Sequence, residues 1–346
     1  MHHLSFASDY QEGCHSAVME LMLATNRQQH EGYGTDAICE SARARIREAC
    51  SCPNAAVHFL SGGTQTNVCV LDALLVPWEG VLAATTGHVS THEAGAIERN
   101  GHKVIELAGE QGKLLPARVR EAAASWAEDA NHDHMVQPGV VYISQPTEYG
   151  TVYTRSELEG LRAACDDYGM RLYVDGARLA YALACDVNDV TLRDLARLAD
   201  AFYIGGTKCG ALLGEAVVFP NPNTCPRFFT LAKQHGALLA KGWLLGMQFE
   251  ALFANDLYLH VGEPAIQAAN AMRQMLVDRG YRLAFDSPTN QVFVELDDAV
   301  ATELAKHVDY SFWEKPDSSH TIVRFASSWA TTPEDVRALA QALDEV

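Results

Sequence analysis

Short apolar runs alternate with amphipathic stretches along the chain from about residue 40 onward. Apolar positions three and four residues apart predict helices over 40–50, 116–130 and 155–169. Short β-branched or aromatic runs bounded by Gly, Pro or polar residues predict buried strands at 56–60, 139–144, 171–176, 200–206 and 215–220. This alternation is typical of an α/β domain with a largely parallel sheet.

The pattern changes after about residue 248. A long helical segment at 263–280 leads to a strand-like run at 290–296, a helix at 301–307, a second strand at 321–326 and a closing helix from Pro333. This order predicts a smaller α+β domain at the carboxyl end. We therefore expect a large domain over 13–248 and a small one over 249–346, with a short segment before them.

Composition narrows the function classes. Of the 346 residues, 48% are hydrophobic and 20% charged, as in a globular protein. The net charge of −18 disfavours nucleic acid and anionic membranes as partners. No apolar run approaches a membrane span and no secretory signal is evident, so we expect a cytoplasmic location. The nine cysteines, an odd number without a CxxC motif, predict free thiols.

Three segments carry residues suited to chemistry. SGGTQTN at 61–67 follows a predicted strand and opens a helix, so its backbone N–H groups can bind a phosphate. Asp175, in YVDGAR, ends a buried strand, where it can pair with a cationic ring nitrogen or act as a loop cap. Lys208, in GGTKCG, follows another strand, and a desolvated lysine there can act as a nucleophilic amine.

The order and separation of these motifs resemble fold-type I enzymes that depend on pyridoxal 5′-phosphate (PLP), the aspartate aminotransferase superfamily. The closest resemblance is to the threonine aldolase and β-eliminating lyase family. ASDY at 7–10, HEGYGTDAICE at 30–40 and TGHVSTHEAGA at 86–96 are similar to further elements of that family. The resemblance covers nearly the whole chain and implies a mainly parallel seven-stranded sheet, together with an amino-terminal arm over 1–12 that contributes to the active site.

The resemblance implies roles for cofactor-binding residues. Lys208 would hold PLP covalently as an internal aldimine, and Asp175 would pair with the pyridinium nitrogen. Gly63 and Thr64 would bind the phosphate, and His88 would stack on the ring. His88 is also the candidate base for the β-hydroxyl of the substrate.

Other residues would contact the substrate or complete the site. Ser8, Arg178 and Arg324 would bind the α-carboxylate, because an arginine fork can be bidentate to it, and Arg178 would also contact the cofactor. Glu93 resembles a carboxylate that positions a water or the histidine, and it is the third candidate catalytic residue after Lys208 and His88.

Two segments depart from the family pattern. The family segment that contributes an arginine to the phosphate is replaced by KQHGALLAKG at 233–242. Lys241 or Lys233 would take over this contact, from the same subunit or from a partner subunit. A second family histidine is replaced within SQPTEYG at 144–150, which has Glu148 and Tyr149. Because of that change, the sequence does not identify the substrate, whose β-substituent could be larger than that of threonine or aromatic.

The implied reaction is cleavage of the Cα–Cβ bond of a β-hydroxy-α-amino acid to glycine and an aldehyde. β-Elimination to a 2-oxo acid and ammonia is the alternative. His88 and His92, four residues apart beside Glu93, offer a distant alternative, a metal-dependent hydrolase, although the order is not HExxH. No metal is expected. The resemblance also implies a homodimer or homotetramer with sites at the subunit interface.

Overall fold

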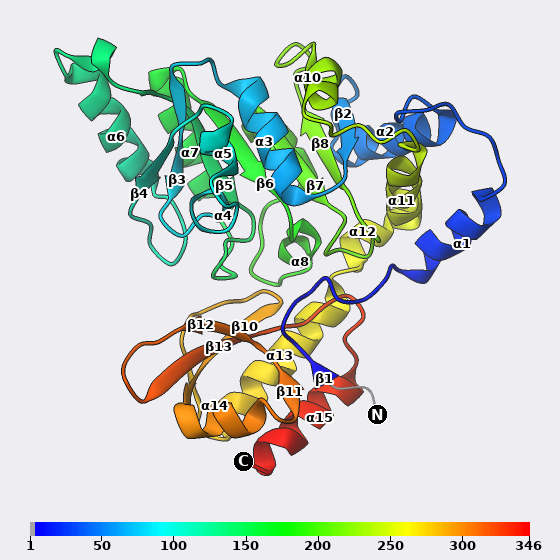
Figure 1. Ribbon diagram of the computed structural model, residues 1–346, viewed down its shortest axis with the longest axis vertical. Coiled ribbons are helices and arrows are strands. Elements are labelled where there is room, and N and C mark those ends of the chain that lie inside the picture. Colours follow the sequence, from blue (N-terminus) through cyan, green and yellow to red (C-terminus); the bar gives the residue numbers. More distant parts are fainter. Residues whose placement is uncertain (1–3) are drawn as a thin grey trace.

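A seven-stranded sheet forms the centre of the larger domain in the computed structural model, which describes residues 4–346 (Figure 1). Its strands run in the order β2-β8-β7-β6-β5-β3-β4, and only β8 is antiparallel to its neighbours. The strands are β2 (Ala56–Leu60), β3 (Glu79–Ala84), β4 (Val104–Leu107), β5 (Gln137–Ser144), β6 (Arg171–Asp175), β7 (Ala201–Gly205) and β8 (Glu215–Phe219). The expected mainly parallel seven-stranded sheet is confirmed.

Five of these strands coincide with predicted runs, whereas β3 and β4 were not predicted. The sequence of β3, EGVLAA, has small residues where strands usually carry β-branched or aromatic ones. It is nevertheless buried between β4 and β5, with Val81 and Leu82 inaccessible to solvent. Tertiary packing, not local propensity, makes this segment a strand.

Helices cover both faces of the sheet. One apolar cluster joins the sheet to α2, α6, α7, α9 and α11, and a second joins the other face to α3, α5 and α10. The helices of this domain are α1 (Ser16–Thr25), α2 (Ala37–Ala49), α3 (Gly63–Leu74), α4 (His88–Thr91), α5 (Ala96–Arg99), α6 (Pro116–Glu128), α7 (Arg155–Tyr168), α8 (Leu179–Leu183), α9 (Leu192–Leu198), α10 (Phe228–Gln234), α11 (Trp243–Phe253) and α12 (Leu257–His260), with 3₁₀ turns at His132–His134 and Ala254–Asp256.

The smaller domain packs helices on an antiparallel sheet of order β12-β13-β10-β9. Its elements are α13 (Glu263–Asp278), β9 (Arg282–Leu283), β10 (Gln291–Asp297), α14 (Asp298–Leu304), β11 (Val308–Asp309), β12 (Ser311–Glu314), β13 (His320–Ala326) and α15 (Pro333–Asp344). The predicted α+β tail is therefore present. The helix expected at 301–307 starts and ends three residues earlier, since the chain enters it directly from β10 and must then turn into β11.

The expected boundary between residues 248 and 249 lies inside α11, whose buried side chains belong to the core of the large domain. The change from that core to the core of the small domain takes place along α13, between Ile266 and Ala268. We therefore place the junction in α13.

The described part of the expected amino-terminal arm, residues 4–12, attaches to the small domain. β1 (Leu4–Ser5) pairs with β11, and Phe6 is buried in the core of that domain. Residues 1–3 of the arm lie outside the described residues. The arm thus crosses from the small domain toward the lower edge of the large sheet (Figure 1).

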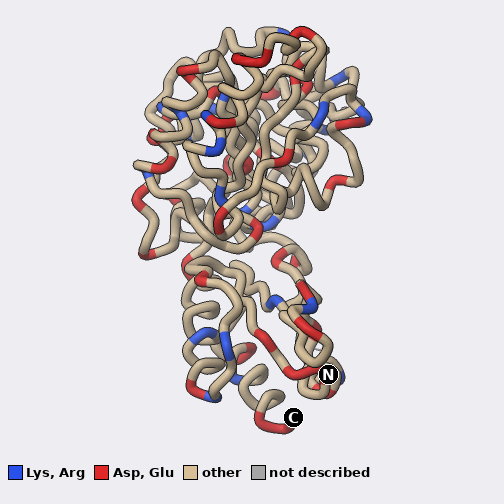
Figure 2. Tube along the Cα trace, turned by 90° about the vertical axis from the view of Figure 1, so that its left-hand side faces the viewer, with Lys and Arg blue, Asp and Glu red and all other residues tan. Residues whose placement is uncertain are grey.

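Acidic side chains are spread over both domains and outnumber basic ones, as the net charge requires (Figure 2). All nine cysteines are free thiols, as predicted. None of the helices in the described part of the chain is both long and apolar enough to cross a bilayer.

Candidate active site

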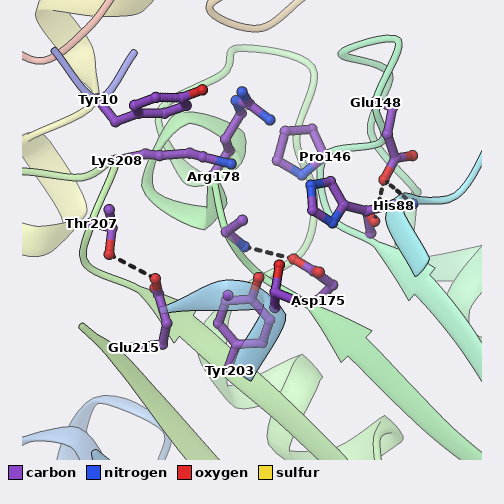
Figure 3. Close-up of a pocket in the computed structure, with 14 residues that line it drawn as sticks. Tyr10, His88, Pro146, Glu148, Asp175, Arg178, Tyr203, Thr207, Lys208 and Glu215 are labelled. Atoms are coloured by element: carbon purple, nitrogen blue, oxygen red, sulfur yellow. Dashed lines mark hydrogen bonds between the residues drawn. The ribbon is translucent and has the colours of Figure 1, made fainter. Parts of the chain in front are cut away.

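A cavity of about 270 Å³, here called the inner cavity, opens beside the carboxyl ends of β5, β6 and β7 (Figure 3). Ligands of parallel α/β sheets bind at this edge. Its lining consists of Tyr10, Gly63, Thr64, His88, Ser144, Pro146, Glu148, Asp175, Ala177, Arg178, Tyr203, Thr207, Lys208 and Glu215. Six residues predicted from the sequence, from four segments of the chain, therefore meet here.

A second cavity of about 550 Å³, the outer cavity, adjoins the first and reaches the small domain. It is lined by Tyr10, His88, His92, Glu148, Arg178, Lys208, Gln291, Ser311, Phe312, Trp313 and Arg324. Five residues line both cavities, so a ligand can extend from one into the other.

Asp175 is held as a buried carboxylate at the end of β6. Its Oδ2 accepts hydrogen bonds from Tyr142 Oη (2.6 Å) and Asn67 Nδ2 (3.0 Å), and its Oδ1 accepts one from the Ala177 N–H (2.9 Å). Burial works against ionisation, but the nearby His88 and hydrogen bonds from Tyr142, Tyr203 and Asn67 outweigh it and lower the pKa of Asp175. The site thus keeps a negative charge at the base of the inner cavity.

The turn after Asp175 is crowded. A Cβ added to Gly176 would lie 2.0 Å from the carbonyl oxygen of Tyr203 in β7, so only glycine fits. This explains the glycine of the DGAR motif in terms of packing between the ends of β6 and β7.

Lys208 enters the same cavity from the loop after β7. Among the described residues it forms no ion pair, and its Nζ lies 5.9 Å from the ring centroid of Tyr10. Desolvation, reinforced by the nearby Arg178 charge, lowers its pKa, despite the opposing effect of Asp9, Asp175 and Glu215. A lowered pKa raises the fraction of neutral, nucleophilic amine.

The first turn of α3 forms another wall. Gly62 caps the helix without a side-chain hydrogen bond, and Gly63 and Thr64 line the inner cavity. The backbone N–H groups at the start of a helix lack intrahelical acceptors, so this twelve-residue helix offers donors to an anion beside Lys208.

His88 and Glu93 form a hydrogen-bonded pair. His88 Nδ1 lies 2.7 Å from Glu93 Oε1, which also accepts from Asn67 Nδ2 at 2.6 Å. Asn67 therefore links Glu93 to Asp175. Burial raises the pKa of Glu93, and its buried Oε2 has no partner among the described residues. Glu93 orients the His88 ring and leaves its Nε2 for a ligand.

The guanidinium of Arg178 is already paired with a carboxylate of the protein. Its Nε and Nη2 donate to the buried Asp9 at 2.6 and 3.0 Å. This pair opposes the desolvation of Asp9 and lowers its pKa to about 2. Of the guanidinium nitrogens of Arg178, only Nη1 has no hydrogen bond to a described residue. Binding of the substrate carboxylate by Arg178 stays a prediction, and Nη1 is the nitrogen available for it.

Arg324, in contrast, faces the outer cavity without a carboxylate partner in the described chain. It donates to Gln291 Oε1 (3.0 Å), Ser311 Oγ (3.2 Å) and the Ala7 carbonyl (3.3 Å), and its Nε is buried and unpartnered. Burial and the Arg178 charge lower its pKa to about 10. A partly buried guanidinium without a carboxylate partner suits an incoming carboxylate.

Three predicted residues lie outside both linings: Glu93, which reaches the site through His88, and Ser8 and Lys241. The Ser8 Oγ, within the arm, is buried and has no partner among residues 4–346, and Lys241 is exposed just before α11. Lys233 packs instead on Tyr33, with its Nζ 4.1 Å from the ring centroid. The roles of these residues stay predictions.

Sequence reasoning missed several residues of the site: Asp9, Tyr10, Asn67, Tyr142, Gln291 and Trp313. The motif ASDY already contained the first two, and a polar residue inside an apolar helix, as Asn67 is, was an available signal.

The fold, the strand-end aspartate and the desolvated lysine define a fold-type I enzyme of the PLP-dependent class. In agreement, Thermus thermophilus aspartate aminotransferase superposes with a TM-score of 0.72 at 17% identity, covering 99% of this chain and 91% of the other. The chain belongs to the beta-eliminating lyase family, whose model matches residues 5–299. This membership confirms the expected fold class and PLP dependence.

The relatives narrow the comparison. The low specificity L-threonine aldolase of Pseudomonas aeruginosa is 32% identical over 98% of this chain and 97% of its own length. The solved threonine aldolase of Leishmania major has a TM-score of 0.95 at 43% identity, covering 99% of this chain and 98% of the other. The similarity includes both domains.

Proposed function

We propose that this protein cleaves the Cα–Cβ bond of L-threonine and related β-hydroxy-α-amino acids to glycine and an aldehyde. The observation that carries the proposal is the partly buried guanidinium of Arg324, which has no carboxylate partner among the described residues and lines the outer cavity, beside the inner cavity of Lys208 and Asp175. Similarity over the full length to a low specificity L-threonine aldolase supports it.

The donors of the inner cavity fit PLP. Lys208 would hold it covalently, Asp175 would pair with its ring nitrogen, and the N-terminus of α3 would bind its phosphate. The bound cofactor supplies an electron-withdrawing ring that stabilises negative charge at Cα. His88, oriented by Glu93, lines the cavity beside that ring site.

β-Elimination is the second candidate, because the family to which the chain belongs is described by that reaction. It breaks a bond from Cβ to a leaving group and needs no base at a β-hydroxyl. The metal-dependent alternative has less support: no three His, Cys, Asp or Glu side chains in residues 4–346 are grouped to hold a metal, and His88 pairs with Glu93.

Product analysis tests the proposal. Purified protein reconstituted with PLP is incubated with L-threonine, L-allo-threonine, phenylserine and L-serine, and products are identified by chromatography. We expect glycine and the matching aldehyde from the first three. A 2-oxo acid and ammonia as the main products would establish β-elimination instead.

Arg324→Ala is expected to raise KM for L-threonine by about 30-fold or more, because a charge-assisted contact to a buried group contributes roughly 2–4 kcal/mol. kcat should change less. Steady-state kinetics measure both, and Arg337→Ala, an exposed residue of α15, is the matched control. An unchanged KM would remove Arg324 as the carboxylate ligand.

A cytoplasmic homo-oligomer also belongs to the proposal. Exposed apolar side chains, among them Leu23, Tyr33 and Phe229, would be covered in an oligomer. The exposed Lys241 would then reach the phosphate of a neighbouring subunit's cofactor. Sedimentation equilibrium distinguishes a homodimer from a homotetramer.

A further inference from the structure

The inner and outer cavities meet at five side chains that line both: Tyr10, His88, Glu148, Arg178 and Lys208. If the proposed function holds, the substrate amine lies at the Lys208 end and its carboxylate at Arg324. The reacting Cα and Cβ then lie at this junction. The residue that receives the β-hydroxyl proton should be one of the five.

Charge and hydrogen bonding reduce the choice to two. Arg178 is a cation paired with Asp9, Lys208 holds the cofactor, and Tyr10 is 59% exposed, with a weakly basic phenol. His88 and Glu148 remain. His88, which the resemblance makes a ring-stacking residue as well as a candidate base, already uses Nδ1 for Glu93.

Glu148 is oriented through one oxygen only. Its Oε1 accepts hydrogen bonds from the His88 N–H (2.9 Å) and Ser144 Oγ (2.8 Å), as Figure 3 shows. Its Oε2 has no hydrogen bond to any residue in the described part of the chain. A carboxylate fixed in this way has one oxygen available for a ligand.

Gln291 connects Glu148 to the carboxylate anchor. The Gln291 side chain accepts from Arg324 Nη1 at 3.0 Å, and its Nε2 donates to the Glu148 carbonyl at 3.5 Å. Gln291 therefore connects the backbone of the loop that carries Glu148 to the Arg324 guanidinium. A substrate carboxylate bound to Arg324 would lie at a defined position relative to the Glu148 side chain.

The surroundings make Glu148 a stronger base than a solvated glutamate. Burial raises its pKa, with a further contribution from Asp175, against the hydrogen bond from Ser144 and the influence of the nearby His88. The titratable and charged groups around it are Tyr10, His88, His92, Glu93, Tyr142, Tyr149, Tyr153, Asp175, Arg178, Tyr203, Lys208, Glu215 and Arg324.

We propose that Oε2 of Glu148 binds the β-hydroxyl of the substrate and accepts its proton as the Cα–Cβ bond breaks. The O–H electron pair becomes the second bond of the aldehyde carbonyl, and the Cα–Cβ pair remains on Cα. Cα takes up one proton from water to give glycine, and Glu148 releases its proton to water, so no net proton is gained or lost. The inference rests on the proposed function and adds a catalytic residue to it.

Glu148→Gln tests the inference in the PLP-loaded enzyme, since Gln keeps an acceptor for Ser144 but cannot take the proton. We expect kcat/KM for L-threonine to fall by about a hundredfold or more. Tyr149→Phe, next in the chain and outside both linings, should retain the wild-type value. Equal cleavage by Glu148→Gln and wild type would overturn the inference, whereas a wild type that forms no glycine would overturn the proposed function.

Binding distinguishes contact with the hydroxyl from a structural role. Titration of the cofactor absorbance gives Kd for L-serine, which has the hydroxyl, and L-alanine, which lacks it. Glu148→Gln should raise the Kd for L-serine about tenfold and leave the Kd for L-alanine unchanged. Equal weakening of both ligands would show that Glu148 only supports the site, and would overturn the inference.

Ser144→Ala supplies a second variant that leaves the carboxylate in place. Because the Ser144 hydrogen bond lowers the pKa of Glu148, its removal should raise that pKa. The acid limb of the kcat/KM profile for L-threonine should then move to higher pH, and in Glu148→Gln it should disappear. An acid limb unchanged in both variants would overturn the inference.

Discussion

Lys208→Ala is expected to abolish cleavage, lowering kcat by at least about a thousandfold, because it removes the only nucleophilic amine described in the inner cavity. The lysine has no other visible function. It forms no ion pair in the described chain, and its loop is fixed through the backbone, since Tyr181 Oη donates to its carbonyl at 2.5 Å. Loss of the side chain should leave the fold intact.

The measurement has two parts. Glycine formation from L-threonine is followed in wild type and variant, and borohydride-treated protein is digested and searched by mass spectrometry for a cofactor-modified peptide. We expect the modification on Lys208 in wild type and nowhere in the variant. Lys306→Ala, which removes an exposed partner of Glu303, is the control. A variant that retains both turnover and modification would assign the cofactor to another lysine.

Most of the fold could be predicted because its central strands have strong local patterns. β5, β6, β7 and β8 are buried apolar runs with clear boundaries, and their alternation with helices predicts the parallel sheet. β3 could not be found in this way. Its alanines and glycine are accommodated by β4 and β5, and a Cβ on Gly80 would lie 2.7 Å from the Lys103 carbonyl.

The site residues also fall into two groups, those whose position could be predicted from the sequence and those whose position could not. Asp175 and Lys208 follow buried strands, so their position at the sheet edge could be inferred from the chain alone. The pairing of Arg178 with Asp9 could not be inferred, because it joins the arm to the large domain across 169 residues. That pairing separates the two arginines: Arg178 is neutralised within the protein, whereas Arg324 is left for a ligand.

Asp175→Asn is expected to lower kcat/KM by about 30-fold to several thousandfold, since breaking a buried, hydrogen-bonded charge pair costs about 2–5 kcal/mol. The amide would carry no charge to pair with a protonated ring nitrogen. It would also present N–H groups where Asp175 Oδ2 now accepts from Tyr142 and Asn67. Affinity for PLP should therefore fall together with turnover.

Two variants separate charge from packing. Tyr142→Phe removes one donor to Asp175 and keeps the charge, so its loss of activity should be much smaller than that of Asp175→Asn. Asp200→Asn breaks the pair with Arg162 (2.6 Å), remote from both cavity linings, and should lower Tm without changing the PLP dissociation constant. Equilibrium titration with PLP and thermal melts of the apoprotein give both quantities. If Asp175→Asn instead lowers Tm as Asp200→Asn does but binds PLP like wild type, the carboxylate is structural, and the ring nitrogen has another partner.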